Sequence, residues 1–86
     1  MKNTRHIMAR IESHFDSMTD LEKRIANYFL NPSSIYDDLS SQKVAQTLYI
    51  SQAALTRFAK KCGFKGYREF NFQYIHQLQS NVEETN

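Results

Sequence analysis

The sequence predicts an all-α fold, a compact bundle of five to six helices. Apolar residues recur at intervals of three and four along most of the 86 residues, which is the spacing of one helix face. No stretch alternates apolar and polar residues for long enough to form a strand. The chain has only 2 Gly and 1 Pro, and these fall where the predicted helices begin or end.

The composition indicates one domain and excludes several classes of protein. The chain is 41% hydrophobic and 23% charged, as in a small globular domain. No apolar run approaches the roughly 18 residues of a membrane span, so we expect a cytoplasmic protein with no membrane contact. The single cysteine, Cys62, excludes a disulfide, and the histidines share no ligand spacing with it, so we expect no metal and no cofactor. No pattern of catalytic residues is present, and we do not expect an enzyme.

Two helices are predicted in the first third of the chain. The first covers about 5–17, where apolar residues recur every four positions. The second begins at Thr19, which forms a Thr-x-x-Glu capping box with Glu22. It ends at Asn31 because the following Pro32 disfavours helical geometry in the residue before it.

Two more helices are predicted between the proline and the middle of the chain. Asn31 and Pro32 are also typical of a cap and a first helical residue, which predicts a short helix through residues 35 and 36. Ser40 or Ser41 then caps a helix whose inward residues are Val44, Ala45 and Leu48.

A further pair of helices completes the predicted domain. Ser51 is an N-cap only three residues after Leu48, so Tyr49 and Ile50 leave room for a tight turn alone. The helix after this turn closes at Gly63. A last helix covers about 67–79, so that residues 1–79 form one domain and residues 80–86 a frayed tail.

Residues 41–62 therefore consist of a short helix, a tight turn and a second helix, which is the arrangement of a helix-turn-helix motif. Ala45 lies where the two helices approach most closely and a larger side chain would clash. In such motifs the second helix enters the major groove of DNA. Because no strands follow, no β wing is expected.

The charge distribution supports a polyanionic partner. Residues 1–39 carry 5 basic and 6 acidic side chains, whereas residues 43–68 carry six cations and no Asp or Glu. A local cationic surface on a chain with a net charge of +2 is typical of modules that bind double-stranded DNA. A solvated helix face explains the same pattern.

Candidate contact residues follow from the helical spacing of the second helix. The residues that we expect to contact bases are Gln52, Ala53, Thr56 and Arg57, whose side chains suit base edges or thymine methyl groups. The residues that we expect to contact the DNA backbone are Lys43, Ser51, Lys60, Lys61, Lys65 and Arg68. Each base contact has an alternative: Thr56 as a surface filler, Ala53 as a helix former, and Arg57 as an ion-pair partner of Glu69.

Several segments of the sequence resemble the N-terminal domain of the RpiR family of bacterial transcription regulators. The resemblance covers about 19–79 and rests on the segments 21–26, 57–61 and 63–70, read as LEKRIA, RFAKK and GFKGYREF. It implies a dimeric, sequence-specific regulator of sugar or amino-sugar metabolism that acts on a palindromic operator. It also implies that a sugar-phosphate effector acts through a C-terminal sugar-isomerase-like domain, which is absent from this chain.

Three residues depart from the pattern of that family. Ala54 stands where Thr is frequent, Cys62 where Leu is common, and Tyr49 where the turn frequently has Gly or Asn. If Tyr49 has a positive φ, its side chain raises the energy of the turn, and we expect a reshaped turn and a tilted second helix. The competing interpretation of the whole chain is a small helical protein-interaction module that docks an acidic partner.

Overall fold

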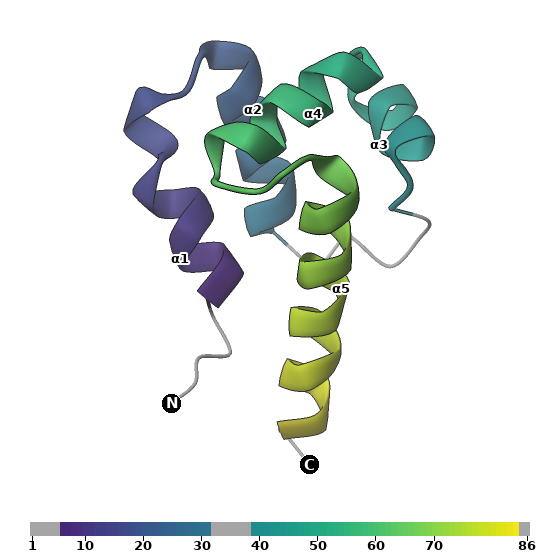
Figure 1. Cartoon of the computed structure of the whole chain (residues 1–86). Coiled ribbons are helices and arrows are strands. Elements are labelled where there is room, and N and C mark those ends of the chain that lie inside the picture. Colours follow the sequence, from purple (N-terminus) through teal and green to yellow (C-terminus); the bar gives the residue numbers. More distant parts are fainter. Residues whose placement is uncertain (1–5, 32–38, 85–86) are drawn as a thin grey trace.

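The computed structural model describes the backbone of residues 6–31 and 39–84 and the side chains of residues 7–31 and 39–78. Within these ranges it contains five α-helices, one short 3₁₀ helix and no strand, so the all-α prediction is confirmed (Figure 1). In chain order the elements are α1 (His6–Ser13), η1 (Phe15–Ser17), α2 (Asp20–Leu30), α3 (Ser41–Leu48), α4 (Gln52–Lys61) and α5 (Tyr67–Glu84).

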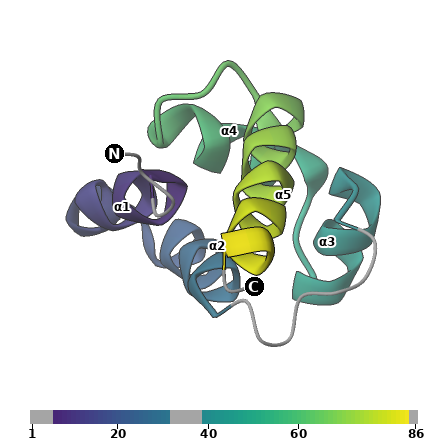
Figure 2. The same ribbon diagram turned by 90° about the horizontal axis from the view of Figure 1, so that it is seen from below.

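The helices pack around α5. Seen from below, α5 runs through the middle of the molecule, with α1 and α2 on one side and α3 on the other (Figure 2). Helix α4 crosses the upper part of the molecule in Figure 1, beside the start of α5. Helices α2 and α5 thus pack against α4 and support the motif that α4 forms with α3.

The predicted helix starts are confirmed by their caps. The hydroxyl of Thr19 accepts a hydrogen bond from the backbone N–H of Glu22, and the Glu22 carboxylate accepts one from the N–H of Thr19. Ser40, rather than Ser41, caps α3, and Ser51 caps α4. Each cap satisfies backbone N–H groups that the first turn of a helix leaves unpaired.

Aromatic side chains from three helices form the centre of the core. Phe29 of α2 is fully buried and lies edge-on to Phe70 and Tyr74 of α5, with ring centroids 4.8 and 4.9 Å apart. Phe58 of α4 stacks on Phe29 and lies edge-on to Phe70. Because each large side chain contributes roughly 1.5–3 kcal/mol when fully buried, this cluster fixes the position of α4 against α2 and α5.

Two tyrosines of α5 hold the chain on both sides of residues 32–38. The hydroxyl of Tyr74 donates to the carbonyl of Phe29 in the last turn of α2, and the hydroxyl of Tyr67 donates to the carbonyl of Leu39. Both hydroxyls therefore have backbone partners inside the core. The last carbonyls of a helix lack intrahelical partners, and Tyr74 supplies one inside the core.

The boundaries of the first and last helices differ from the prediction. Helix α1 ends at Ser13 rather than near residue 17, because the backbone leaves helical geometry at His14 and the hydroxyls of Ser13 and Ser17 donate to carbonyls three residues earlier. Helix α5 continues to Glu84, since no Gly or Pro follows Gly66; residues 80–84 are therefore helical. The short helix predicted through residues 35 and 36 lies outside the described residues.

Candidate nucleic-acid interface

Helix α4 has one face in the core and one in solvent. Its inward residues pack on α2, α3 and α5, and they are Ala54, Leu55, Phe58 and Ala59. Val44 and Ala45 of α3 are buried against them, as the predicted motif requires. Leu48 and Ile50 pack on the same cluster from the turn. This packing holds α4 at a fixed position. The residues of its outward face are therefore fixed in place, although they contribute little to the core.

The turn between the two helices has a left-handed residue that is not glycine. Tyr49 has φ 59° and ψ 48°, so the positive φ considered from the sequence is confirmed. The N–H groups of Tyr49 and Ile50 donate to the carbonyls of Gln46 and Ala45, which is the hydrogen-bond pattern of a Schellman motif. The Tyr49 side chain is 92% exposed and points into solvent. The reshaped turn and the tilted second helix stay predictions.

The same closing motif ends α4, where glycine occupies the left-handed position. Gly63 has φ 96°, and the N–H groups of Gly63 and Phe64 donate to Lys60 and Ala59. The guanidinium of Arg10 lies over the ring of Phe64, 4.1 Å from its centroid, and donates to the carbonyl of Gly63. Helix α1 therefore supports the C-terminal end of α4.

A second arginine supports the turn itself. Arg24 of α2 donates to the carbonyl of Leu48, the last residue of α3, over 2.6 Å. That carbonyl lacks a partner within its own helix. The motif is thus braced by α2 at its turn and by α1 at its far end, and neither arginine was identified from the sequence.

The four residues predicted to contact bases lie together on α4. Gln52, Ala53 and Arg57 are exposed, and Thr56 is half-exposed. Thr56 donates a long hydrogen bond of 3.4 Å to the carbonyl of Gln52 and otherwise faces outward. No salt bridge to Arg57 is present among the described residues. Glu69, the partner considered from the sequence, accepts from the backbone N–H of Lys65. The guanidinium of Arg57 is therefore available to a partner.

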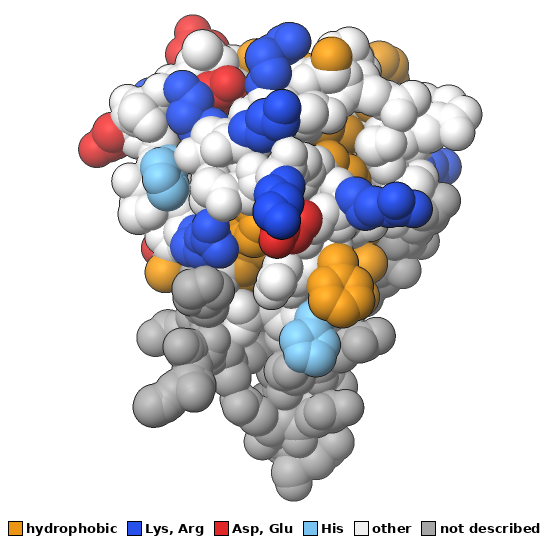
Figure 3. Space-filling model, in the orientation of Figure 1, with side chains coloured by type: hydrophobic (Ala, Val, Ile, Leu, Met, Phe, Trp, Pro, Cys, Tyr) orange, Lys and Arg blue, Asp and Glu red, His pale blue; other side chains and the backbone are white. Residues whose placement is uncertain are grey.

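Most of the predicted backbone contacts also lie in solvent. Figure 3 shows Lys and Arg side chains gathered over the upper part of one face, where α1, α4 and the start of α5 lie. The exposed residues of the predicted set are Lys43 on α3, Ser51 at the N-cap of α4, Lys60 on α4, Lys65 in the link that follows, and Arg68 on α5. The Ser51 hydroxyl accepts from the N–H of Ala54, so its cap role is confirmed.

Lys61 is placed differently from the other cations. Its ammonium donates to the carbonyl of Ser17 and lies 3.7 Å from the carboxylate of Glu22. The side chain is half-buried and reaches toward η1 and α2. The structure thus gives Lys61 partners within the fold, which differs from the role in DNA contact predicted from the sequence.

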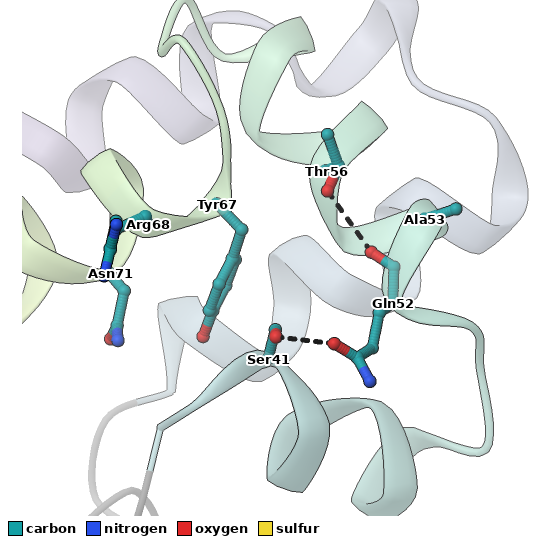
Figure 4. A pocket seen from close by; sticks show the side chains of 7 residues that line it. All are labelled: Ser41, Gln52, Ala53, Thr56, Tyr67, Arg68 and Asn71. Carbon is teal, nitrogen blue, oxygen red and sulfur yellow. Dashed lines mark hydrogen bonds between the residues drawn. The ribbon is translucent and has the colours of Figure 1, made fainter.

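A shallow groove of about 420 Å³ runs beside the outward face of α4. Residues of α4 form one wall and the start of α5 the other (Figure 4). Ser41 of α3 lies at its floor and donates a 2.8 Å hydrogen bond to the side-chain oxygen of Gln52. Asn71 of α5 also lines the groove, and its side-chain oxygen is buried without a hydrogen bond among the described residues. Sequence reasoning missed Ser41 and Asn71, because no local pattern marks residues that meet across three helices.

The described residues offer little for other kinds of chemistry. They contain no group of three or more His, Cys, Asp and Glu side chains that could hold a metal ion. Cys62 is fully buried, and burial raises the pKa of its thiol from 9.0 to about 11, which leaves it protonated and unreactive at neutral pH. No helix within the same ranges is long and apolar enough to cross a membrane.

A buried helix pair, a tight turn and an outward polar face on the second helix define the class of helix-turn-helix DNA-binding domains. Residues 5–81 match the family model of the helix-turn-helix domain of the rpiR family, and the chain belongs to that family. The family consists of DNA-binding domains of transcription regulators, and it is not a class of enzymes.

Two curated relatives support this assignment. The chain is 32% identical over 78 residues to an uncharacterized HTH-type transcriptional regulator of Haemophilus influenzae. The matched segment covers 91% of the chain and 27% of that relative. It is 29% identical over 76 residues to the uncharacterized HTH-type transcriptional regulator YfhH of Escherichia coli, covering 88% of the chain and 27% of that relative. The chain thus spans about a quarter of the length of these relatives.

Proposed function

We propose that the chain reads a specific DNA sequence with the outward face of α4. The observation that carries the proposal is the exposure of this face. Gln52, Ala53 and Arg57 project from a helix whose opposite side is locked in the core, and Arg57 has no acidic partner among the described residues. Side chains that are free to contact a partner and rigidly positioned suit the reading of base edges.

In this proposal the cations around α4 fix the domain on the DNA backbone. Exposed Lys and Arg side chains neutralise phosphates and orient the reading helix without specifying sequence. Those with no intramolecular ion pair in the described part of the chain are Lys43, Lys60, Lys65 and Arg68. Ser51 opens α4, where backbone N–H groups favour an anion. Lys61 is left out of this set because it pairs with Glu22.

We further propose that two copies act as a homodimer on a palindromic operator. The reading helices of such a dimer are about 34–36 Å apart, one turn of DNA. The resemblance to the RpiR family supports a regulator of sugar or amino-sugar metabolism in the cytoplasm, in which a sugar phosphate binds a domain outside this chain. No catalytic role is part of the proposal.

Selection from random duplexes tests the proposal. The wild-type protein is incubated with a pool of random duplexes at two salt concentrations, the tightest sequences are recovered, and affinities are measured by fluorescence anisotropy. We expect enrichment of a palindromic motif and a loss of about 1–3 kcal/mol with Arg57→Ala, mainly at one base pair in each half-site.

Lys23→Ala is the charge-matched control, because it also removes one cation but from α2. It should leave the base preferences unchanged. Sedimentation of the protein on the selected duplex gives the number of copies bound. Binding that stays independent of sequence, even when the domain is fused to a dimerising segment, would contradict the proposal and favour an acidic protein partner.

A further inference from the structure

On the outward face of α4, the side chain of Gln52 is held in place by a residue of another helix. The hydroxyl of Ser41 donates to the Gln52 side-chain oxygen over 2.8 Å (Figure 4). Ser41 is the first residue of α3 and Gln52 the first residue of α4. One hydrogen bond therefore joins the starts of the two helices of the motif, at the edge of the groove beside the reading helix.

This bond determines which atoms of Gln52 face outward. A serine hydroxyl has one proton, and here that proton is used on the amide oxygen. The amide nitrogen of Gln52 keeps both of its N–H donors free of any partner among the described residues. The amide oxygen keeps a second lone pair. The outward edge of the side chain thus presents donors beside one remaining acceptor site.

We propose that Ser41 is a positioning residue for DNA reading: it orients the Gln52 amide for an adenine. Adenine presents an acceptor at N7 and a donor at N6 in the major groove, and glutamine matches the pair with its nitrogen and oxygen. The inference rests on the proposed function of α4. Ser41 acts through Gln52 and has no contact with a base.

Holding the side chain before binding favours this geometry. A free glutamine loses much of its rotamer freedom when it is ordered at an interface. It can also turn its amide over, and it then presents the opposite pattern of donor and acceptor. The hydrogen bond from Ser41 favours one orientation in the free protein, so less ordering remains for the complex.

The test measures base preference position by position. A library of all single-base variants of the sequence selected by the wild-type protein is titrated with wild type, Ser41→Ala, Gln52→Ala and the double variant. We expect Ser41→Ala to reduce the preference for adenine about three- to tenfold, at the same base pair that Gln52→Ala affects and at no other. In the double variant the effect of Ser41→Ala should vanish.

Two further variants separate positioning from a structural role. Ser41→Thr keeps the hydroxyl and should restore the preference. Thr47→Ala removes a hydroxyl from the same helix, and it should change no base preference. Among the described residues this hydroxyl bonds only to the carbonyl of Lys43. In the free protein, the NMR signals of the Gln52 side-chain amide should shift in Ser41→Ala and remain in place in Thr47→Ala.

The possible outcomes distinguish this inference from the proposed function. An equal loss of affinity for every sequence in Ser41→Ala indicates a phosphate contact or a folding defect and overturns the inference while α4 still reads DNA. Unchanged preferences and unchanged amide signals overturn it as well. If the wild-type protein selects no sequence at all, the proposed function fails, and the inference fails with it.

Discussion

Tyr49 occupies a conformation that most residues avoid, and it does so with an exposed side chain. A residue other than glycine in the left-handed region raises the energy of the folded state by roughly 1–2 kcal/mol. Gly63 performs the same role at the end of α4 without that strain. Because the Tyr49 side chain is 92% exposed, its removal gives up no core packing.

We therefore predict that Tyr49→Asn stabilises the domain by about 0.5–1 kcal/mol, since asparagine tolerates left-handed geometry better than tyrosine. Thermal and urea unfolding measure the change. Gly63→Ala is the reciprocal control and should destabilise, because its φ is 96° and an added Cβ would lie 2.6 Å from the Arg10 guanidinium. A lower midpoint for Tyr49→Asn would show that the tyrosine makes a stabilising contact.

The buried thiol of Cys62 predicts a loss of stability at alkaline pH. Burial raises the pKa of the folded thiol from 9.0 to about 11. The unfolded thiol loses its proton first, so the contribution is complete below about pH 9 and decreases as the pH rises toward 11. A shift of this size corresponds to an effect on the order of 2 kcal/mol. Burial also raises the pKa of Tyr74, which acts in the same direction at higher pH.

Urea unfolding of wild type and Cys62→Ala between about pH 8 and pH 11, under reducing conditions, isolates the thiol. We expect the free energy of unfolding to decrease more steeply with pH for wild type than for the variant. Parallel curves would mean that the thiol titrates equally in both states.

At the scale of elements, the capping box of α2 connects to the end of α4. The Glu22 carboxylate accepts from the N–H of Thr19 and lies 3.7 Å from the ammonium of Lys61. The start of α2 and the last residue of α4 thus share one carboxylate. Since Glu22 is largely buried, its loss would disturb both helices.

We predict that Thr19→Ala lowers the free energy of unfolding by about 1 kcal/mol, because it leaves a backbone N–H of the first turn without its partner. Thr19→Ser keeps the accepting oxygen and should remain close to wild type. Chemical denaturation followed by circular dichroism gives both values. Equal stability of the alanine and serine variants would exclude an energetic role for this cap.

A helix boundary could be predicted from the sequence where a recognised pattern of neighbouring residues determines it. The caps at Thr19 and Ser51 follow from residues within a few positions, and the structure confirms them. The sequence left the sign of φ at Tyr49 open, and the structure shows that it is positive. The break at His14 arises from serine hydroxyls that compete for backbone carbonyls, and no apolar pattern reports such competition.

The candidate site divides in the same way. The exposure of Gln52, Ala53 and Arg57 follows from helical periodicity. The bond from Ser41 to Gln52 and the support of Leu48 by Arg24 join residues 11 and 24 positions apart. Lys61 looked equivalent to Lys60 in the sequence, and only the packing of α4 beside η1 and α2 separates them.

For the whole molecule, the arrangement of cations determines how DNA binding responds to salt. Each neutralised phosphate contributes about −0.9 to the slope of log K against log salt concentration. We predict that Lys60→Ala reduces the magnitude of the slope by about 0.9, whereas Lys61→Ala leaves it unchanged. Lys60 and Lys61 are adjacent, and both substitutions remove one positive charge, so each variant is a control for the other. Anisotropy titrations over a series of salt concentrations measure both.

A slope that falls equally in both variants would show that Lys61 leaves Glu22 to contact DNA. In the proposed case, Lys61→Ala instead lowers the melting temperature slightly, because an ion pair near the surface contributes about 1 kcal/mol or less. The same titrations therefore decide which of two adjacent lysines serves the fold and which serves the ligand.

The two faces of α4 have a consequence for divergence among related proteins. The inward face carries the packing of the domain, whereas Ala53, Arg57 and Lys60 project into solvent and contribute nothing to the core. Under the proposed function, substitutions at Ala53 and Arg57 change the preferred operator at almost no expense of stability, whereas a substitution at Lys60 changes the affinity for every sequence. A duplicated copy could acquire a new operator in a few mutational steps, and the domain could be retargeted by design on an unchanged scaffold.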